Sequence, residues 1–302
     1  MPITRISFFL DTNNLTGGKA LHYTAVLHIN MNKILCSTGA LMGKANNRDY
    51  WLLEEYAQKI MCDGFEFMMY SYWYDSVDKL VAGLQQMPIN IPVMHCEKRI
   101  CEAISRNEDG DLAQALQLFT VNCEVAAAIN ASKIVLHLWN GIISDKFIQN
   151  NIHAFGALKE IADKNKLDLM VENVVCSNAD PMKHWSTLAK QYPEISFVFD
   201  TKMAAFHNQM ELIYSSEYEW LWSNGNIKHL HINDYAGGHK EWESLQTLPI
   251  GRGNINFNRF FKFLAQHNYE GFYTVEAPAL NSEGNIDFDM LNSCFKYIRE
   301  CI

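Results

Sequence analysis

Four hydrophobic runs in the second half of the chain each close on a residue that could bind a divalent metal. These residues are Glu172 in LDLMVENV, Asp200 in ISFVFDTK, His231 in IKHLHIND and Glu276 in GFYTVEAP. A buried parallel strand reads as a near-continuous run of Val, Ile, Leu and Phe, so a charge that closes it lies where the strand leaves the core. One such acid alone is as well explained by a salt-bridged strand end. Three carboxylates and an imidazole together predict one site for Mn²⁺, Co²⁺, Zn²⁺ or Mg²⁺.

Strand-like runs and amphipathic segments alternate along the chain from Lys33 onward. The first four runs are KILCSTGAL, GFEFMMY, IPVMHCEK and KIVLHLWNG, and the last four end at the candidate ligands. Helices are predicted at residues 49–61, 75–86, 111–130 and 147–164, from about 180, and at stretches that include 217–222, 256–266 and 289–299. Eight strand–helix units in strict alternation predict an α/β fold, a (β/α)8 TIM barrel over residues 33–302.

Two questions of organisation remain open at this level. A doubly wound open sheet would want a glycine-rich phosphate turn after its first strand. STGALMG lacks the G-x-G-x-x-G spacing, which favours the barrel. Residues 1–32 stand outside the repeat, and we expect them to form a short N-terminal extension. RISFFL and YTAVLHI could pair there as a β-hairpin, or the segment could simply lead into the first strand.

Composition excludes several classes of function. The 302 residues are 48% hydrophobic and 20% charged, which is ordinary for a globular protein. A net charge of −9 provides no basic field for nucleic acid. The eight cysteines form no CxxC pair and fall mostly in apolar patterns, which favours a reducing, cytoplasmic location. No apolar run reaches the length of a signal-peptide core or a membrane span, so we expect no membrane association.

Five further residues are candidates for substrate binding. His95 and His137 close the third and fourth strands, so they belong to the carboxyl-terminal face that carries the active site in barrels of this kind. We expect them to contact substrate hydroxyls or line the cavity, the alternative being satisfied core histidines. Lys202 and Arg252 could anchor a phosphate or carboxylate of the substrate, or lie on the surface. Trp139 could stack on a sugar ring, although packing explains most aromatic residues.

The segments V-E-N, F-D-T, H-I-N-D with the following G-R-G-N-I-N-F, and T-V-E-A resemble the xylose isomerase-like barrel superfamily over residues 33–302. That superfamily includes sugar isomerases, ketose 3-epimerases, inosose dehydratase and endonuclease IV. The resemblance implies that Glu172, Asp200, His231 and Glu276 hold the metal and that Glu172 and Glu276 form the acid/base pair. It implies a metal-dependent isomerase or epimerase of a small sugar, ketose or polyol derivative, which moves a proton through an enediolate.

Departures from the superfamily's pattern limit which of its functions this chain is expected to share. Met203 stands where a D-x-x-H histidine is common, and Asn178 stands where epimerase-like members have a second glutamate. Leu245 and Thr247 occupy the places of the D-x-H that endonuclease IV-like members use for a third metal. These losses argue against a DNA-repair nuclease. The resemblance still allows a second ion held by His95 and His137 together with the first glutamate.

Two other functions stay open. A dehydratase of a ketopolyol would share the first proton abstraction, so the sequence does not separate it from an isomerase. The second is a sugar-binding barrel that has lost catalysis, which Met203 and Asn178 favour. The intact set of four candidate ligands argues against it, because paired carboxylates without a cation repel each other. We expect a small carbohydrate-like substrate, and homo-oligomers are frequent among the proteins that the chain resembles.

Overall fold

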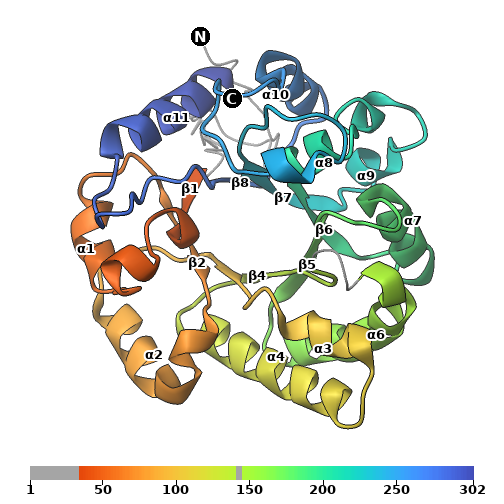
Figure 1. Ribbon diagram of the computed structural model, residues 1–302, viewed down its shortest axis with the longest axis horizontal. Helices are drawn as coiled ribbons and strands as arrows, with labels where there is room; N and C mark the ends of the chain where they lie inside the picture. The colour runs from red at the N-terminus through yellow and green to blue at the C-terminus, as the bar shows by residue number, and fades with distance from the viewer. Residues whose placement is uncertain (1–33, 141–144) are drawn as a thin grey trace, which may run out of the picture.

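The computed structural model describes residues 34–140 and 145–302, and it has the barrel that the sequence predicts (Figure 1). Eight parallel strands close in chain order, with the last pairing to the first. They are β1 Ile34–Ser37, β2 Gly64–Met68, β3 Val93–His95, β4 Lys133–Leu136, β5 Asp168–Glu172, β6 Ser196–Asp200, β7 Ile227–Ile232 and β8 Phe272–Val275. The hairpin predicted within residues 1–32 lies outside the described residues.

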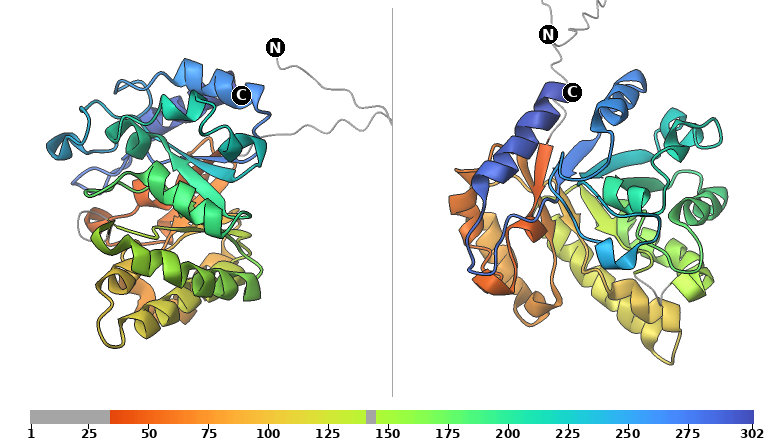
Figure 2. Two further views of the ribbon diagram at one scale, coloured as in Figure 1. Left: turned by 90° about the vertical axis from the view of Figure 1, so that its right-hand side faces the viewer. Right: turned by 45° about the horizontal axis from the view of Figure 1, so that its top comes forward.

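Helices surround the strands in the view of Figure 1, and the turned views of Figure 2 show the same helices packed around the outside of the barrel. They are α1 Leu52–Ala57, α2 Val77–Gln86, α3 Ile100–Arg106, α4 Asp111–Ala128, α6 Ile148–Lys164, α7 Pro181–Gln191, α8 Thr201–Phe206, α9 Trp220–Ser223, α10 Phe257–Gln266 and α11 Phe288–Cys301. In the described part of the chain, no helix combines the length and apolar character that crossing a membrane requires.

Helix starts follow the capping chemistry of the sequence. The carboxylate of Asp180 accepts the backbone N–H of Lys183, with Pro181 in the first turn of α7. Asn256 caps α10 in the same way. The helices differ from the prediction in three places. Helix α3 after β3 and helix α8 after β6 were not predicted, and the helix predicted around residues 217–222 is reduced to the four residues of α9.

The barrel interior is built in layers. Leu35, Val93, Val135, Met170 and Val198 form a separate apolar cluster inside the strands. A larger core fills the space between the strands and the helices. Because side chains on a strand alternate between faces, the residue two positions after each of these five also points inward. The apolar layer therefore fixes which side chains emerge at the carboxyl end of the barrel.

Candidate functional site

Because every second side chain of a strand points to the same face, the predicted site residues lie directly above the apolar layer. His95 and His137 follow Val93 and Val135 by two residues, and both are buried. Glu172 follows Met170, and Asp200 follows Val198, in the same way. The paired strands β6 and β7 set Asp200 beside His231 in register. The sequence thus delivers one ring of polar side chains at a single level of the barrel.

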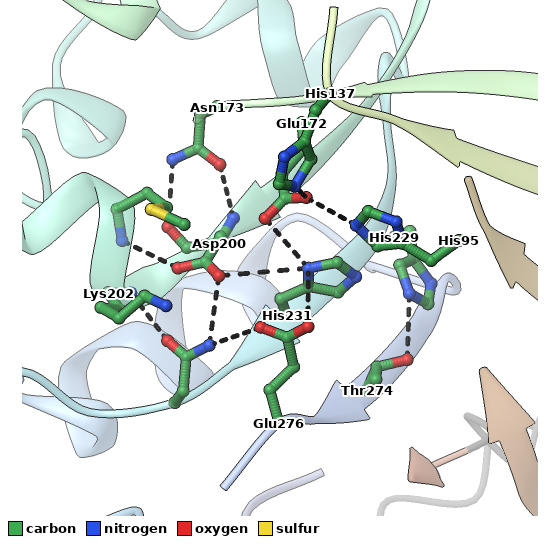
Figure 3. A network of polar contacts seen from close by, with 12 residues as sticks. His95, His137, Glu172, Asn173, Asp200, Lys202, His229, His231, Thr274 and Glu276 are labelled. Atoms are coloured by element: carbon green, nitrogen blue, oxygen red, sulfur yellow. Dashed lines mark hydrogen bonds and ion pairs between the residues drawn. The ribbon is translucent and has the colours of Figure 1, made fainter. Parts of the chain in front are cut away.

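His231 is the centre of the candidate metal cluster, defined here as Glu172, Asp200, His231 and Glu276 (Figure 3). Its Nδ1 atom lies 3.2 Å from Oε1 of Glu172, 3.7 Å from Oε1 of Glu276 and 4.0 Å from Oδ2 of Asp200. Ligand atoms of Glu172, Asp200 and His231 all lie within 4.8 Å of one another. Four predicted residues from four strand ends therefore converge on one point.

Two asparagines from the sequence motifs hold the acids of the cluster. The side-chain amide of Asn233 donates to Oδ2 of Asp200 at 3.1 Å and to Oε2 of Glu276 at 3.0 Å. Asn173 bonds both backbone groups of Asp200, accepting from its N–H at 2.6 Å and donating to its carbonyl at 3.0 Å. The second oxygen of Asp200 caps α8 through the N–H of Met203. Each carboxylate is thereby oriented with an oxygen toward His231.

Glu66 is a functional candidate that sequence reasoning missed. It lies on β2, fully buried, and its carboxylate is 3.0 Å from Nε2 of His231. It also contacts Nε2 of His229 at 2.6 Å and accepts the hydroxyl of Thr274 at 2.8 Å. A carboxylate behind one ring nitrogen of a histidine fixes the proton there and leaves the other nitrogen as a free donor atom. A lone acid inside the apolar run GFEFM was the available signal.

The charged side chains in and behind the metal cluster shift one another's pKa values. Burial would raise the pKa of Glu66, but His231 and His229 lower it well below its usual range. Burial would lower the pKa of His231, and Glu66 and Glu276 raise it well above its usual range. The pKa of Asp200 rises to about 6, chiefly through burial, with Lys202 opposing and Glu172 adding. Such a set binds positive charge, either a proton or a cation.

The donor set fits a divalent metal ion. Nδ1 of His231 is directed at three carboxylates while Nε2 is occupied by Glu66, so Nδ1 would present its lone pair to a cation that takes the place of the Nδ1 proton. Three carboxylates and one imidazole are the ligands that Mn²⁺, Mg²⁺, Co²⁺ and Zn²⁺ accept. Like charges this close and this buried repel, and a cation removes that repulsion.

His95 and His137 meet the cluster from its other side. Nδ1 of His95 is 2.7 Å from the carbonyl of Cys96, and its Nε2 is 3.2 Å from Oε2 of Glu172. Nε2 of His137 is 2.8 Å from the same oxygen but lacks the alignment of a hydrogen bond. The structure thus brings both histidines to Glu172, as a second group of possible ligands.

An open cavity of about 400 Å³ lies above the cluster. Glu276 lines it, and its side chain, at 12% exposed, is the most accessible of the four candidate ligands. Tyr70, Lys98, Lys202 and Thr247 line the same cavity. The site is therefore open to a small molecule on the Glu276 side and closed by protein on the Glu66 side.

Comparison with known proteins agrees with this geometry. Residues 55–294 match the family described as the xylose isomerase-like TIM barrel. The chain belongs to this family. No curated protein sequence matches it.

Among solved structures that share the family's fold is a D-allulose 3-epimerase from Methylomonas sp. in complex with D-allulose. It has 14% identity and a TM-score of 0.65, with 90% of this chain and 98% of that chain covered. The 3-keto-D-glucoside 4-epimerase YcjR from E. coli has 14% identity and a TM-score of 0.65, with 90% and 100% covered. The IolI protein with a bound zinc atom has 15% identity and a TM-score of 0.64, with 89% and 97% covered.

Two residues that the sequence predicts to bind substrate, Arg252 and Trp139, do not line the cavity. Arg252 is exposed in a turn whose flanking Gly251 and Gly253 both donate N–H bonds to Asp234 at 2.9 Å. Trp139 is fully buried, and its indole N–H donates to the carbonyl of Val174 at 2.8 Å. Of the residues predicted to anchor an anion, the structure brings Lys202 alone to the cavity.

The positions that depart from the superfamily's pattern have their own local contacts. Asn178 donates its side-chain amide to Asp145 at 3.1 Å rather than to an acid of the metal cluster. Met203 sits in the first turn of α8, where its N–H bonds Asp200. His207 accepts the backbone N–H of Cys176 at 2.9 Å, so it does not take the place of the missing D-x-x-H histidine.

Proposed function

We propose that this protein is a divalent-metal-dependent isomerase or epimerase of a small sugar, ketose or polyol derivative. The observation that carries the proposal is the convergence of Glu172, Asp200 and Glu276 on the Nδ1 side of His231, with Glu66 on its Nε2 side. A folded barrel has no need of this arrangement, because burying three acids together costs free energy unless a cation joins them.

Glu172 and Glu276 are the proposed acid/base pair. A divalent ion held by the four cluster residues would supply Lewis acidity toward a substrate carbonyl and neighbouring hydroxyl. Asn233 donates to Oε2 of Glu276 and so fixes the direction of this carboxylate, to which we assign removal of the proton from a substrate carbon. His231 and Lys98 outweigh burial and lower the pKa of Glu276, so the base is ionised at neutral pH.

The return of the proton falls to Glu172, the other glutamate that faces Nδ1 of His231. Its Oε2 lies within 3.2 Å of a ring nitrogen of both His95 and His137, so either imidazole can exchange a proton with it. Removal by one carboxylate and delivery by the other inverts the carbon, whereas return to a neighbouring atom gives an isomer. No oxidant or reductant is consumed in either case.

Metal content is the test of the proposal. Purified protein should hold one Mn, Co, Zn or Mg per chain, and Glu172→Gln/Glu276→Gln should lose it. Glu124→Gln, which removes an exposed acid from α4, is the matched control and should keep the ion. Two ions per chain would bring His95 and His137 into the metal site. No ion after reconstitution with each of these metals would overturn the proposal in favour of a sugar-binding barrel.

Solvent exchange separates the two candidate reactions. In D₂O, an isomerase or epimerase incorporates deuterium at the substrate carbon and releases an isomeric ketose. A dehydratase working through the same abstraction releases water and a product of lower mass. Mass spectrometry of a panel of ketoses and ketopolyols distinguishes these outcomes, and the Glu172→Gln/Glu276→Gln variant is the blank.

A further inference from the structure

The cavity above the metal cluster contains more positive charge than a neutral sugar requires. Two ammonium groups line it, from Lys98 in the loop after β3 and from Lys202 in the first turn of α8. The sequence pattern singled out Lys202 and missed Lys98. Neither lysine has a carboxylate oxygen within ion-pair distance in the described part of the chain.

Lys202 is held as a buried cation with unused donors. It is 9% exposed, and its Nζ donates to the hydroxyl of Thr247 at 2.9 Å. An ammonium has three N–H donors, and this is the one hydrogen bond recorded for Nζ among the described residues. The oxygen of Thr247 accepts from Lys202, so its own proton stays available to a ligand. Both side chains line the cavity.

Lys98 lines the same cavity, although it lies in the loop after β3 and is far from Lys202 in the sequence. It is half-buried, and burial alone would lower its pKa, but the fields of Glu276 and Glu172 more than offset this and raise the pKa. It therefore remains an ammonium at neutral pH. Lys98 and Lys202 both lower the pKa of Glu276, which shows that the two cations act on one region.

The other charged residues around the cavity do not neutralise these lysines. The guanidinium of Arg99 is 3.4 Å from Glu102, and its side chain is largely exposed. Glu97 accepts the backbone N–H of Arg99 at 3.1 Å. If the lysines served only to balance the metal cluster, they would pair directly with its carboxylates. Instead each leaves N–H donors for a ligand that carries its own negative charge.

We propose that the substrate is an anionic sugar derivative, a phosphate ester or a sugar acid, whose charged group binds Lys98, Lys202 and the hydroxyl of Thr247. The proposal rests on the proposed function for the identity of the sugar part. Ammonium groups act as point charges toward either anion, so the chemistry shared by phosphate and carboxylate is what the site recognises.

Calorimetric titration of the full chain tests this with four probes. Inorganic phosphate is the first. The other three share one ketose skeleton: D-fructose is neutral, D-fructose 6-phosphate carries a phosphate ester, and D-fructuronate carries a carboxylate at the same carbon. At least one anionic sugar should bind about tenfold or more tightly than fructose, since each hydrogen bond to a charged group accounts for about this factor. Preference between the two anionic sugars identifies the natural class.

Single variants assign the effect to the two lysines. Lys98→Gln and Lys202→Gln should each weaken binding of the preferred anion about tenfold or more and change fructose binding much less. Lys228→Gln removes the same charge from an exposed position at the start of β7, and it should have no effect. Equal affinity for fructose and both anions, failure of phosphate and both anionic sugars to bind, or equal losses in Lys228→Gln would overturn the proposal.

Metal content measured on the same samples keeps this inference distinct from the proposed function. Protein that binds one ion but shows no preference for an anion retains the isomerase proposal and loses the anion subsite. Protein that prefers the anion but binds no ion retains the subsite and loses the metal-dependent chemistry.

Discussion

Two buried groups of acid and imidazole side chains in this barrel differ in how their carboxylates are satisfied. In the loop after β4, Asp145 accepts the backbone N–H groups of Ser177, Asn178 and Ala179 at 2.9–3.0 Å, and the side chain of Asn178 as well. In the metal cluster, carboxylate oxygens of Glu172 and Glu276 face His231 and a neighbouring acid. The carboxylate of Asp145 accepts hydrogen bonds from the backbone. The carboxylates of the metal cluster lie close to one another and still require positive charge between them.

The difference separates an acid with a structural role from the acids that we propose to bind a metal ion. Ligand atoms of Asp145, Cys176 and His184 also lie within 4.8 Å of one another, so proximity alone would nominate a second metal site. The four N–H donors on Asp145 already stabilise its charge, and burial raises the pKa of the Cys176 thiol, which disfavours a thiolate ligand. We interpret Asp145 as the anchor of the loop that follows β5.

The largest expected effect comes from removing the base. Glu276→Gln keeps the size of the side chain but cannot accept a proton. Because general base catalysis contributes about 10²–10⁴-fold, kcat should fall by that range. The measurement is deuterium exchange into the ketose that the wild-type protein turns over fastest, with metal content determined in parallel. Retained exchange in a metal-loaded Glu276→Gln sample would rule out the two-glutamate mechanism.

The second prediction concerns the residue behind the metal cluster. Glu66→Gln should weaken metal binding by about 10–100-fold, because it loosens the ring orientation of His231 without removing a ligand. A fluorescent-chelator competition measures the dissociation constant directly. Thr274→Val removes another partner of Glu66 but none of His231, so it is the matched control and should change metal affinity less. Equal losses in both variants would mean that Glu66 acts on packing alone.

Much of this site was readable from sequence because of where strands end. A charge that terminates an apolar run must lie at the barrel mouth, which is why Glu172 and Asp200 were found and why β5 and β6 end at these residues. Glu66 escaped because its neighbours depend on how β1 pairs with β2 and β8 and how β8 pairs with β7, and these registers bring it to His229 and Thr274. One strand's pattern holds no information on those neighbours.

Loop residues were predicted less well, for a physical reason. The alternation of side chains stops with the strand, so the direction of a residue beyond it is set by loop hydrogen bonds. Trp139 lies three residues after β4 and turns into the core through its bond to Val174. Lys98 was read as part of a strand that in fact ends at His95. Its place at the cavity follows from the loop between β3 and α3.

The third prediction tests the loop anchor against the metal cluster. Asp145→Asn replaces an oxygen that accepts two N–H groups with an amide that donates, so two donors lose their acceptor whichever oxygen is replaced. Hydrogen bonds to charged groups contribute about 1.5–3 kcal/mol each, and the free energy of unfolding should fall by about 3 kcal/mol or more. Urea denaturation measures this. Metal content should stay unchanged, and loss of the ion in this variant would mean that the two groups are not independent.

The fourth prediction has the smallest expected effect and concerns His207, which accepts a hydrogen bond from the loop that Asp145 anchors. Protonation of His207 should make the stability of the protein depend on pH. Burial lowers the pKa of His207 to about 4, and its ordinary value is 6.5. Between these values the unfolded chain binds a proton that the folded protein does not, so the free energy of unfolding falls as the pH falls. About 1 kcal/mol should be lost between pH 6.5 and 5.5. His207→Gln still offers an acceptor to the N–H of Cys176, so the variant should keep its stability near pH 7.5 and show a flatter pH profile in urea. An unchanged profile would assign the acid sensitivity to other buried histidines such as His184, whose pKa burial also lowers.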